Sequence, residues 1–338
     1  MTDYFRPLVQ IGPVRPDTAV QLAGGWGWFT HVEVMSRDAP AQVIPANALP
    51  ADVMQRLTAP RPPIAGMSLD RPRIMGILNT TPDSFSDGGQ HEGLADAVAA
   101  GLAMAQSGAD IIDIGGESTR PGAQTVPIEV EINRTAPTIS ALRAAGLTQP
   151  ISIDTRKAAV AEAAVAMGAN LVNDVSGFTY DPALGPFCQK HHLPVCVMHA
   201  QGDPETMHLN PTYSNVVLDV YDALERQISM LEVSGIARSA ILADPGIGFG
   251  KNLDHNLALL ARISLFHTLG TPILLGVSRK KFIGTLGNAP QAKDRAAGSI
   301  GVALAGLAQG VQLVRVHDVA ETLQAVSLWH AAYSGSIL

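Results

Sequence analysis

Three side chains that accept hydrogen bonds each follow a short apolar run: Asp154 after PISI, Asn173 after NLV and Asp244 after AILA. A buried carboxylate without a partner costs several kcal/mol, so each acid must meet a donor. A flat ligand with several N–H groups along one edge, such as a 2-amino-4-oxopyrimidine, would satisfy all three together. Pairing within the chain, with Arg156, Lys157 or backbone amides, is the alternative, and the sequence leaves both open.

Basic residues gather towards the C-terminal end of the chain. Arg279, Lys280 and Lys281 follow one apolar run, and Arg315 and His317 lie within LVRVH. A lone Lys-Lys pair is usually the solvated start of a helix, but a buried Arg315 requires an anionic partner. Because the formal net charge of the chain is −7, an anionic ligand must be held by a local cluster of this kind.

Two polar loops that contain glycine follow the first two apolar runs, at 77–89 and 113–123. The first carries Asn79, and the second carries Glu117 and Arg120. Loops of this composition suit lids that order around a ligand, and an arginine beside a glycine pair suits a phosphate or carboxylate. An ordinary surface turn and an Arg120–Glu117 salt bridge are the respective alternatives.

The segment DPGIGFGK, at 244–251, invites comparison with a phosphate-binding loop but lacks the Walker spacing. Its glycines are expected to let the backbone pass close to a ligand or to Phe249. His199, in VMHAQGDP, is more often a hydrogen-bonded structural residue than a catalyst. No histidines have metal-ligand spacing, so the sequence predicts no zinc site, and it contains no nucleophile elbow.

Eight apolar runs rich in Ile, Val and Leu recur between residues 74 and 318, and each ends in polar residues. Their alternation with stretches that could hold helices predicts a (β/α)8 TIM barrel, in which the carboxyl ends of all strands face one mouth. The predicted strands are 74–79, 110–115, 150–154, 170–175, 194–199, 240–246, 272–278 and 312–318. The predicted helices are 93–108, 129–146, 157–168, 183–192, 215–235, 255–267, 294–310 and 320–334.

Residues 1–70 do not follow this alternation. They contain WGWFTHVEVMS (26–36), which predicts a strand, and the proline-rich APRPPI (59–64), which predicts a stiff linker. We therefore expect an N-terminal extension over 1–70 that packs against the barrel and carries no catalytic residues. The catalytic barrel is expected over 71–338.

Composition limits the class of protein. Hydrophobic residues make up 46% of the chain and charged residues 16%, which suits a large buried core and argues against disorder. The net charge of −7 argues against binding to nucleic acid or to an anionic membrane. Only two cysteines, no secretion signal and no apolar run of about 18 residues favour a cytoplasmic protein.

These segments together resemble the dihydropteroate synthase family of pterin-binding enzymes. The two family signatures are matched nearly in full by IMGILNTTPDSFSDGG and DIIDIGGESTRPGA, and SIDTRK, NDVSG, MHAQGDP, DPGIGFGK, GVSRK and RVHDV follow in order. The resemblance covers residues 72–335. It implies a TIM barrel that condenses 7,8-dihydropterin-6-ylmethyl diphosphate with p-aminobenzoate, with Mg²⁺ as cofactor, and releases diphosphate in folate biosynthesis.

The resemblance also implies roles for individual residues. The pterin ring would be held by Asp154, Asn173, Met198, Asp244, Phe249 and Lys280. The diphosphate would be bound by Asn79, Arg120, Arg315 and His317, with Asn79 also near Mg²⁺. The p-aminobenzoate pocket would be shaped by Phe85, Thr119, Pro121 and Lys281. The residues expected to act in catalysis are Asp113, Asp154, Lys280, Arg315 and His317.

The chemistry of this reaction suits these residue types. Diphosphate leaves from a methylene conjugated with the pterin imine, so a delocalised cation is accessible, and anionic Asp113 and Asp154 would favour it. Arg315 and His317, with Mg²⁺, would stabilise the departing anion. The arylamine attacks as a neutral nucleophile and needs no strong base, and its carboxylate could rest on the N-terminus of the helix after Lys280. Loops closing overhead would exclude water.

The resemblance carries two further expectations. Family members that are insensitive to sulfonamides carry an insertion near the TRP loop, and this chain has none, so sulfonamides are expected to inhibit it. The family is usually homodimeric, and we expect a homodimer formed through helices on the outside of the barrel.

Two other functions stay open from the sequence. A methyltetrahydrofolate:corrinoid methyltransferase has a similar barrel with pterin-binding Asp and Asn positions, but it gives no reason for STRPG, SRKK and RVH together. A catalytically silent pterin-binding paralogue would act as an interaction or regulatory protein. Diphosphate release on mixing the two substrates distinguishes a synthase from the methyltransferase. Measuring turnover, and not only binding, distinguishes a synthase from the silent paralogue.

Overall fold

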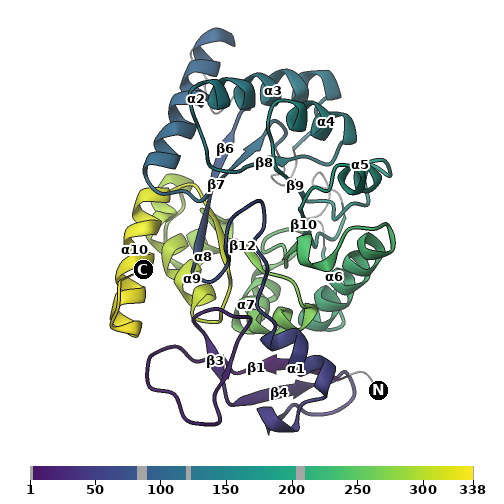
Figure 1. Cartoon of the computed structure of the whole chain (residues 1–338), viewed down its shortest axis with the longest axis vertical. Helices are drawn as coiled ribbons and strands as arrows, with labels where there is room; N and C mark the ends of the chain where they lie inside the picture. Colours follow the sequence, from purple (N-terminus) through teal and green to yellow (C-terminus); the bar gives the residue numbers. More distant parts are fainter. Residues whose placement is uncertain (1–2, 82–89, 119–122, 203–209, 338) are drawn as a thin grey trace.

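Eight parallel strands form a barrel in the computed structural model, which describes residues 3–81, 90–118, 123–202 and 210–337 (Figure 1). They pair in the order β11-β10-β9-β8-β7-β6-β13-β12, and a parallel bridge between Ala243 and Ile273 joins the two ends of this order. The strands are β6 (Arg73–Asn79), β7 (Ile111–Gly115), β8 (Ile151–Asp154), β9 (Leu171–Asp174), β10 (Val195–Met198), β11 (Ile241–Asp244), β12 (Leu274–Gly276) and β13 (Leu313–Val316). The predicted TIM barrel is confirmed.

Helices alternate with these strands and cover the outside of the barrel (Figure 1). They are α2 (Gln90–Gln106), α3 (Ile128–Ala144), α4 (Ala158–Ala166), α5 (Leu184–Lys190), α6 (Val216–Val233), α7 (Leu253–Ala261), α8 (Lys281–Leu286), α9 (Ala296–Leu307) and α10 (Val319–Ser334). Asn215 caps α6 and Asn252 caps α7, because each side chain accepts hydrogen bonds from backbone N–H groups of the first turn. No helix within the described ranges has the length and apolar character of a membrane span.

The predicted helix at 255–267 is wrong in its second half. Helix α7 ends at Ala261, and a 3-10 helix, η4 (Ile263–Leu269), continues the chain. Every residue of η4 is buried, and the Ser264 hydroxyl donates to the carbonyl of Pro7 in the N-terminal part of the chain. A surface α-helix keeps one polar face in solvent. The segment 263–269 is buried on all sides, so it does not extend the surface helix α7.

The interior of the barrel is closed at one end by the segment before β6. Ile64, Met67 and Leu69 are buried against inward-facing side chains of the strands, which include Met75 and Leu242. Ile64 and Met67 bridge across a tight turn formed by Ala65 and Gly66, both with positive φ. The predicted stiff linker at 59–64 is therefore wrong in part, because its last residue begins a plug for the barrel.

Residues 3–58, here called the N-terminal module, form a small sheet and a helix. An antiparallel sheet combines β1 (Tyr4–Pro7), β4 (His31–Met35) and β5 (Gln42–Pro45), β2 (Val20–Gln21) pairs with β3 (Trp28–Phe29), and α1 (Ala51–Thr58) follows. The strand predicted at 26–36 is broken at Thr30, because β3 and β4 pair with different partners. Phe29, Val32 and Leu57 form the core of the module.

The N-terminal module packs on the outside of the barrel, at one end of the molecule (Figure 1). Arg37 forms salt bridges with Asp219 and Asp222 of α6, and the Trp26 indole donates to the carbonyl of Leu307 at the end of α9. The boundary predicted at residue 70 stays a prediction.

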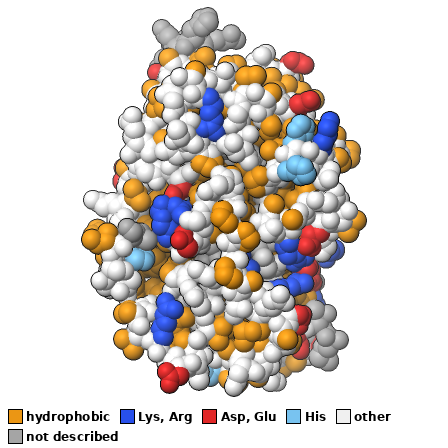
Figure 2. Space-filling model, in the orientation of Figure 1, with side chains coloured by type: hydrophobic (Ala, Val, Ile, Leu, Met, Phe, Trp, Pro, Cys, Tyr) orange, Lys and Arg blue, Asp and Glu red, His pale blue; other side chains and the backbone are white. Residues whose placement is uncertain are grey.

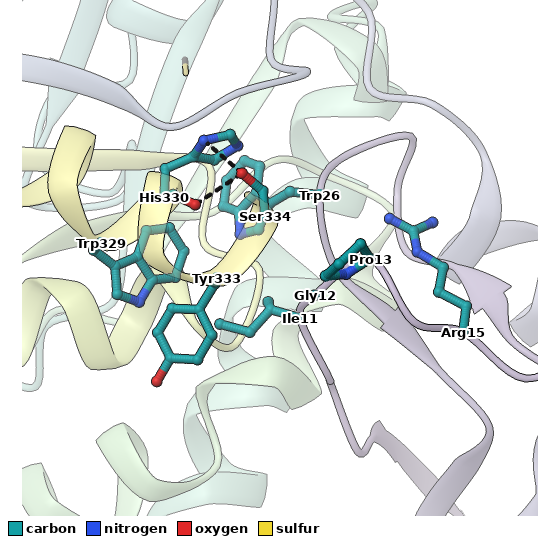
Figure 3. Close-up of a pocket in the computed structure, with 9 residues that line it drawn as sticks. All are labelled: Ile11, Gly12, Pro13, Arg15, Trp26, Trp329, His330, Tyr333 and Ser334. Carbon is teal, nitrogen blue, oxygen red and sulfur yellow. Dashed lines mark hydrogen bonds between the residues drawn. The ribbon is translucent and has the colours of Figure 1, made fainter. Parts of the chain in front are cut away.

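A cavity of 230 Å³ lies where the N-terminal module meets the end of α10 (Figure 3). Trp26 of the module and Trp329 and Tyr333 of α10 contribute aromatic side chains to its wall. None of the predicted site residues lines it. The chemistry expected from the sequence therefore belongs elsewhere, at the mouth of the barrel.

Charge is distributed in small groups on the face drawn in Figure 2, where acidic and basic side chains lie close to one another. The chain has a net charge of −7, and this face shows no broad basic patch. Binding of an anion has to rely on a local arrangement of cations, as at the mouth described next.

Candidate active site at the barrel mouth

Strand register places the predicted acceptors side by side. Asp154 on β8 is the direct neighbour of Asn173 on β9, and Met198 on β10 is the direct neighbour of Asp244 on β11. All four lie at or next to the carboxyl ends of their strands and are buried. The sequence prediction that these side chains converge is confirmed by the geometry.

Arg315 joins two of the predicted carboxylates. Its Nε donates to Asp113 at 2.6 Å and its Nη2 donates to Asp154 at 2.7 Å. Asn173 lies against the same carboxylate, with Nδ2 at 3.3 Å from Asp113. The alternative in which Asp154 pairs with Arg156 or Lys157 is wrong, because those two cations bind Glu117 instead.

The electrostatics of the mouth follow from burial. Burial raises the pKa of Asp154 to about 8, with Asp113 adding to the rise and Arg315 opposing it. Burial also raises the pKa of Asp244, and Lys280 opposes that shift. Although burial acts against it, the two aspartates raise the pKa of Arg315. The mouth therefore holds desolvated carboxylates that a ligand with N–H donors would stabilise.

Lys280 lies between the acidic pocket and an aromatic ring. Its Nζ is 4.5 Å from the centre of the Phe249 ring and donates to the carbonyl of Ile247. Burial lowers the pKa of Lys280 to about 8, while Asp244 opposes the change. The geometry brings Lys280, Phe249 and Asp244 together as the sequence predicted.

His317 is oriented by a residue that the sequence analysis did not single out. The Ser278 hydroxyl accepts a hydrogen bond from the His317 backbone N–H at 3.1 Å, and it lies 2.9 Å from Nδ1 of the same residue. A hydroxyl has one proton and two lone pairs, so both contacts form together and hold the imidazole ring in one orientation. The only sequence signal was a serine at the end of a strand.

Two members of the predicted basic cluster have other surroundings. Arg279 has a positive φ of 57° and binds Asp318, so its charge is already partnered. Lys281 begins α8 with an exposed side chain. Among the described residues of this cluster, Lys280 and Arg315 are therefore the half-buried cations of the mouth, and His317 follows Arg315 on the same segment.

Asn79 ends β6 and is half-buried beside Gly115. A Cβ placed on Gly115 would lie 3.7 Å from a carboxylate oxygen of Asp154 and 3.8 Å from Oδ1 of Asn79. Because Gly115 has no side chain, a small space remains between the Asp154 carboxylate oxygen and the Asn79 amide oxygen. Four further predicted site residues lie outside the described residues: Phe85, Thr119, Arg120 and Pro121.

A buried charge network lies behind the second loop. Glu117 accepts hydrogen bonds from Arg156 at 2.6 Å and from Lys157 at 2.6 Å, and Lys157 also binds Glu131. Glu117 additionally accepts from the backbone N–H of Val126 at 2.7 Å, which joins the two ends of the loop. An Arg120–Glu117 salt bridge was one expectation from the sequence, whereas the network of Glu117 with Arg156 and Lys157 was not predicted.

The glycine-rich turn at 244–251 passes close to the segment that follows β10. A Cβ on Gly246 would lie 1.9 Å from the carbonyl oxygen of His199, and one on Gly250 would lie 2.5 Å from that of Gln201. Both glycines have positive φ. These distances give both glycines a close partner other than Phe249, and the approach of a ligand to this turn stays a prediction.

Known proteins match this chain over the barrel. The sequence profile described as "Pterin binding enzyme" matches residues 75–317. The dihydropteroate synthase of Escherichia coli (strain K12) is 45% identical over 271 residues, which cover 80% of this chain and 95% of the relative.

Solved structures agree with that match. The Xanthomonas albilineans dihydropteroate synthase with 4-aminobenzoic acid superposes with a TM-score of 0.75 at 45% identity, covering 79% of this chain and 96% of that one. The Yersinia pestis dihydropteroate synthase in a sulfonamide drug complex gives a TM-score of 0.74 at 44% identity, covering 79% and 96%.

Proposed function

This chain belongs to the pterin binding enzyme family, and we propose that its barrel mouth carries out the dihydropteroate synthase reaction through the residues assigned below. The reaction is a transfer: 7,8-dihydropterin-6-ylmethyl diphosphate and p-aminobenzoate give 7,8-dihydropteroate and diphosphate, a step of folate biosynthesis. The observation that carries the assignment is Arg315, whose guanidinium binds Asp113 and Asp154 at one mouth that also holds Lys280 and His317.

The pterin subsite consists of the buried acceptors and the groups around them. Asp154, Asn173 and Asp244 offer oxygens to the N–H edge of the ring, and charge-assisted hydrogen bonds of this kind contribute roughly 1.5–3 kcal/mol each. Met198 and Phe249 are assigned to the faces of the flat ring. Lys280, beside Asp244, supplies a donor for the carbonyl side of the pterin.

The diphosphate subsite adjoins the pterin subsite. Arg315 uses Nε and Nη2 for the aspartates, while its Nη1 has no hydrogen bond to a described residue and can donate to the leaving group. The imidazole of His317, oriented by Ser278, is assigned to this subsite, and Asn79 ends the neighbouring strand β6. Arg120 is assigned to the same subsite from its place in the STRPG motif.

The residues present fit a magnesium ion that is shared with the substrate. Mg²⁺ prefers oxygen ligands and commonly binds one or two protein groups, substrate phosphates and water. Asn79 offers an amide oxygen next to the space above Gly115, and within the described ranges no group of three or more His, Cys, Asp or Glu forms a closed cage. The ion, when bound, would neutralise charge on the leaving diphosphate.

Catalysis then depends on matching charge at the reacting methylene. As the carbon–oxygen bond to diphosphate breaks, positive charge spreads over the pterin, and the ionised aspartates stabilise it. Arg315 and His317 stabilise the negative charge on the leaving oxygens. The neutral amine of p-aminobenzoate forms the new carbon–nitrogen bond and then loses its proton to solvent, so the mouth needs no strong base.

The p-aminobenzoate pocket is assigned to Phe85, Thr119, Pro121 and Lys281. Lys281 begins α8 beside Lys280, which places an exposed cation near the mouth for the carboxylate of this substrate. Sulfonamides resemble p-aminobenzoate in shape, and a Yersinia pestis relative is described in complex with a sulfonamide drug. We therefore propose that sulfonamides compete with p-aminobenzoate here; turnover unaffected by sulfonamide at low p-aminobenzoate would contradict this.

A homodimer through the outer helices is supported by the surface of α9. This helix contains no charged residue, and its exposed positions include Ala297, Gly301 and Ala305. It packs beside α10, where Leu328 is 67% exposed. Light scattering on Leu328→Arg tests the proposal: a monomer is expected, and an unchanged dimer contradicts it.

A cytoplasmic location is likewise a proposal. Cys188 and Cys196 are both free thiols, and both are buried in the barrel. Thiols persist in a reducing compartment. Localisation of a tagged full-length chain tests this, and secretion of the chain would contradict it.

Diphosphate release tests the proposed function directly. The full chain is mixed with both substrates and Mg²⁺, and diphosphate and dihydropteroate are both quantified. Equal amounts of the two products are expected. Binding of the pterin without turnover would favour a silent paralogue, and methyl transfer from methyltetrahydrofolate to a corrinoid would favour the methyltransferase.

A further inference from the structure

Lys251 is buried at the end of the glycine-rich turn that follows β11, and among the described residues its amine forms no salt bridge. Its Nζ lies 2.9 Å from the carbonyl oxygen of Gly246, 2.9 Å from that of Phe249 and 2.9 Å from Nδ1 of His199. The carbonyl oxygen of His199 is a fourth, longer contact at 3.3 Å. A lysine ammonium has three N–H donors, so the three short contacts account for all of them.

The backbone of the turn is folded so that its carbonyls face this amine. Gly246, Gly248 and Gly250 all have positive φ, which other residues adopt rarely. The Tyr213 hydroxyl donates to the carbonyl of Gly250 at 2.8 Å. The carbonyls of Gly246 and Phe249 from the turn and that of His199 therefore surround the Lys251 amine, and these three carbonyls are here called the cage.

This cage fixes the two pterin-facing residues of the turn. The backbone N–H of Gly246 donates to the Asp244 carboxylate at 2.7 Å, and the N–H of Phe249 donates to the Gly246 carbonyl at 3.1 Å. Lys251 donates to the carbonyls of Gly246 and Phe249. It therefore contacts both the residue whose N–H binds Asp244 and the residue that carries the aromatic ring. Movement of the amine would therefore displace both Asp244 and the Phe249 ring.

We propose that Lys251 is a positioning residue for pterin recognition, an inference that rests on the proposed function. Its ammonium ties the turn to His199, which follows the neighbouring strand β10, and so sets the spacing between the Asp244 carboxylate and the Phe249 ring. While Lys251 is charged it has no lone pair, so Nδ1 of His199 must accept, and the proton of the neutral imidazole then lies on Nε2. His199 acts as the anchor of the lysine, not as a catalyst.

The charge of Lys251 also acts on Asp244. Burial raises the pKa of Asp244, and Lys280, Lys251 and Arg315 all oppose that rise. Burial lowers the pKa of Lys251 well below its usual value, Lys280 adds to this and Asp244 opposes it. Other titratable or charged groups near the turn are His199 and Tyr213, which contact it, Arg226, which acts on His199, and His255 with Asp254 at the start of α7. Loss of the ammonium would leave Asp244 protonated to higher pH.

Lys251→Met, which removes charge and donors at similar length, tests the proposal in the full chain. The KM for the dihydropterin diphosphate is expected to rise about tenfold or more, the loss of one charge-assisted interaction, while the KM for p-aminobenzoate changes less than about twofold. The acid limb of kcat/KM is expected to move to higher pH. Lys190→Met, on the surface at the end of α5, is the matched control and should behave as the wild type.

Binding of 6-hydroxymethyl-7,8-dihydropterin, measured by calorimetry, separates this proposal from the proposed function. If the wild type does not release diphosphate, the proposed function fails, and this binding measurement still tests Lys251. A folded Lys251→Met with unchanged pterin affinity and an unchanged acid limb overturns the positioning role. Should that variant not fold, Lys251→Gln, which retains amide donors without charge, is judged by the same two readouts.

Discussion

Asp154 and Arg315 are separated by 161 residues in the chain, yet Nη2 of the arginine donates to the carboxylate at 2.7 Å. Their strands, β8 and β13, are not adjacent, because β7 and β6 lie between them in the sheet. The pair therefore forms across the mouth of the barrel. Arg315 stands at the boundary between an acidic pocket that suits a pterin and a cationic pocket that suits diphosphate.

The ionisation of Asp154 predicts a pH dependence. Burial raises its pKa to about 8, so kcat/KM for the pterin substrate should fall as the pH falls below about 8, where the carboxylate gains a proton. Asp154→Asn should lower kcat/KM and flatten this limb. Steady-state rates from about pH 5 to about pH 9, roughly two units on each side of neutrality, measure this pH dependence. A wild-type profile that is flat across this range would contradict the assignment.

The same shift predicts the sign of a stability change. A carboxyl group with a raised pKa contributes stability below its ordinary pKa, and that contribution is lost as the pH rises through the folded value. The Tm of Asp154→Asn should therefore rise relative to that of the wild type as the pH increases towards 8. An opposite trend would mean that Arg315 outweighs burial.

Ser278→Ala should weaken diphosphate binding. The hydroxyl holds the imidazole of His317 in one orientation, and a neutral hydrogen bond contributes roughly 0.5–1.5 kcal/mol, or about three- to tenfold in affinity. Product inhibition by inorganic diphosphate measures the effect. Ser234→Ala, at the end of α6, is the matched control. Equal inhibition constants for both variants would show that Ser278 has no part in orienting His317.

How much the sequence foretold depends on the kind of contact. Strand ends and their polar residues follow from periodicity alone, so the meeting of Asp154, Asn173 and Asp244 was predictable. The partners of buried charges were not predictable, because several acidic residues could pair with Arg315 and only the three-dimensional arrangement determines which of them do. Arg279 is an example, since its positive φ turns it towards Asp318.

Other features were hidden because they depend on close backbone approach. Nothing in DPGIGFGK indicates that the carbonyls of Gly246 and Phe249 accept hydrogen bonds from Lys251. The plug at Ile64 was hidden for a related reason, since a proline-rich segment suggests a linker and only the barrel interior gives its apolar residues a place to pack.

Glu117→Gln should destabilise the fold. Breaking a buried ion pair costs about 3–5 kcal/mol, and Glu117 contacts both Arg156 and Lys157. Burial opposes ionisation, but Lys157, the Val126 N–H and Arg156 together lower the pKa of Glu117, so its contribution to stability is lost as the pH falls through that lowered value. Urea unfolding at pH 7 and pH 4 measures this, with exposed Glu162→Gln as the control. A variant as stable as the control at pH 7 would contradict the prediction.

Ile64→Ala should test the plug of the barrel. Ile64 is 1% exposed, and truncation of a buried isoleucine to alanine costs roughly 2–5 kcal/mol. Val14→Ala, at a position 87% exposed, is the control and should change stability by less than about 0.5 kcal/mol. Chemical denaturation measures both. Equal stabilities would mean that the segment does not support the barrel.

The most direct measurement is diphosphate release by the wild type, Asp154→Ala and Arg315→Ala, with circular dichroism to confirm that each is folded. Each variant should lose activity by about 100-fold or more, because each removes a charged group that acts at the reacting methylene or the leaving group. A folded variant of either residue that retains activity within a few-fold of the wild type would contradict the claim that one guanidinium links the pterin and diphosphate subsites.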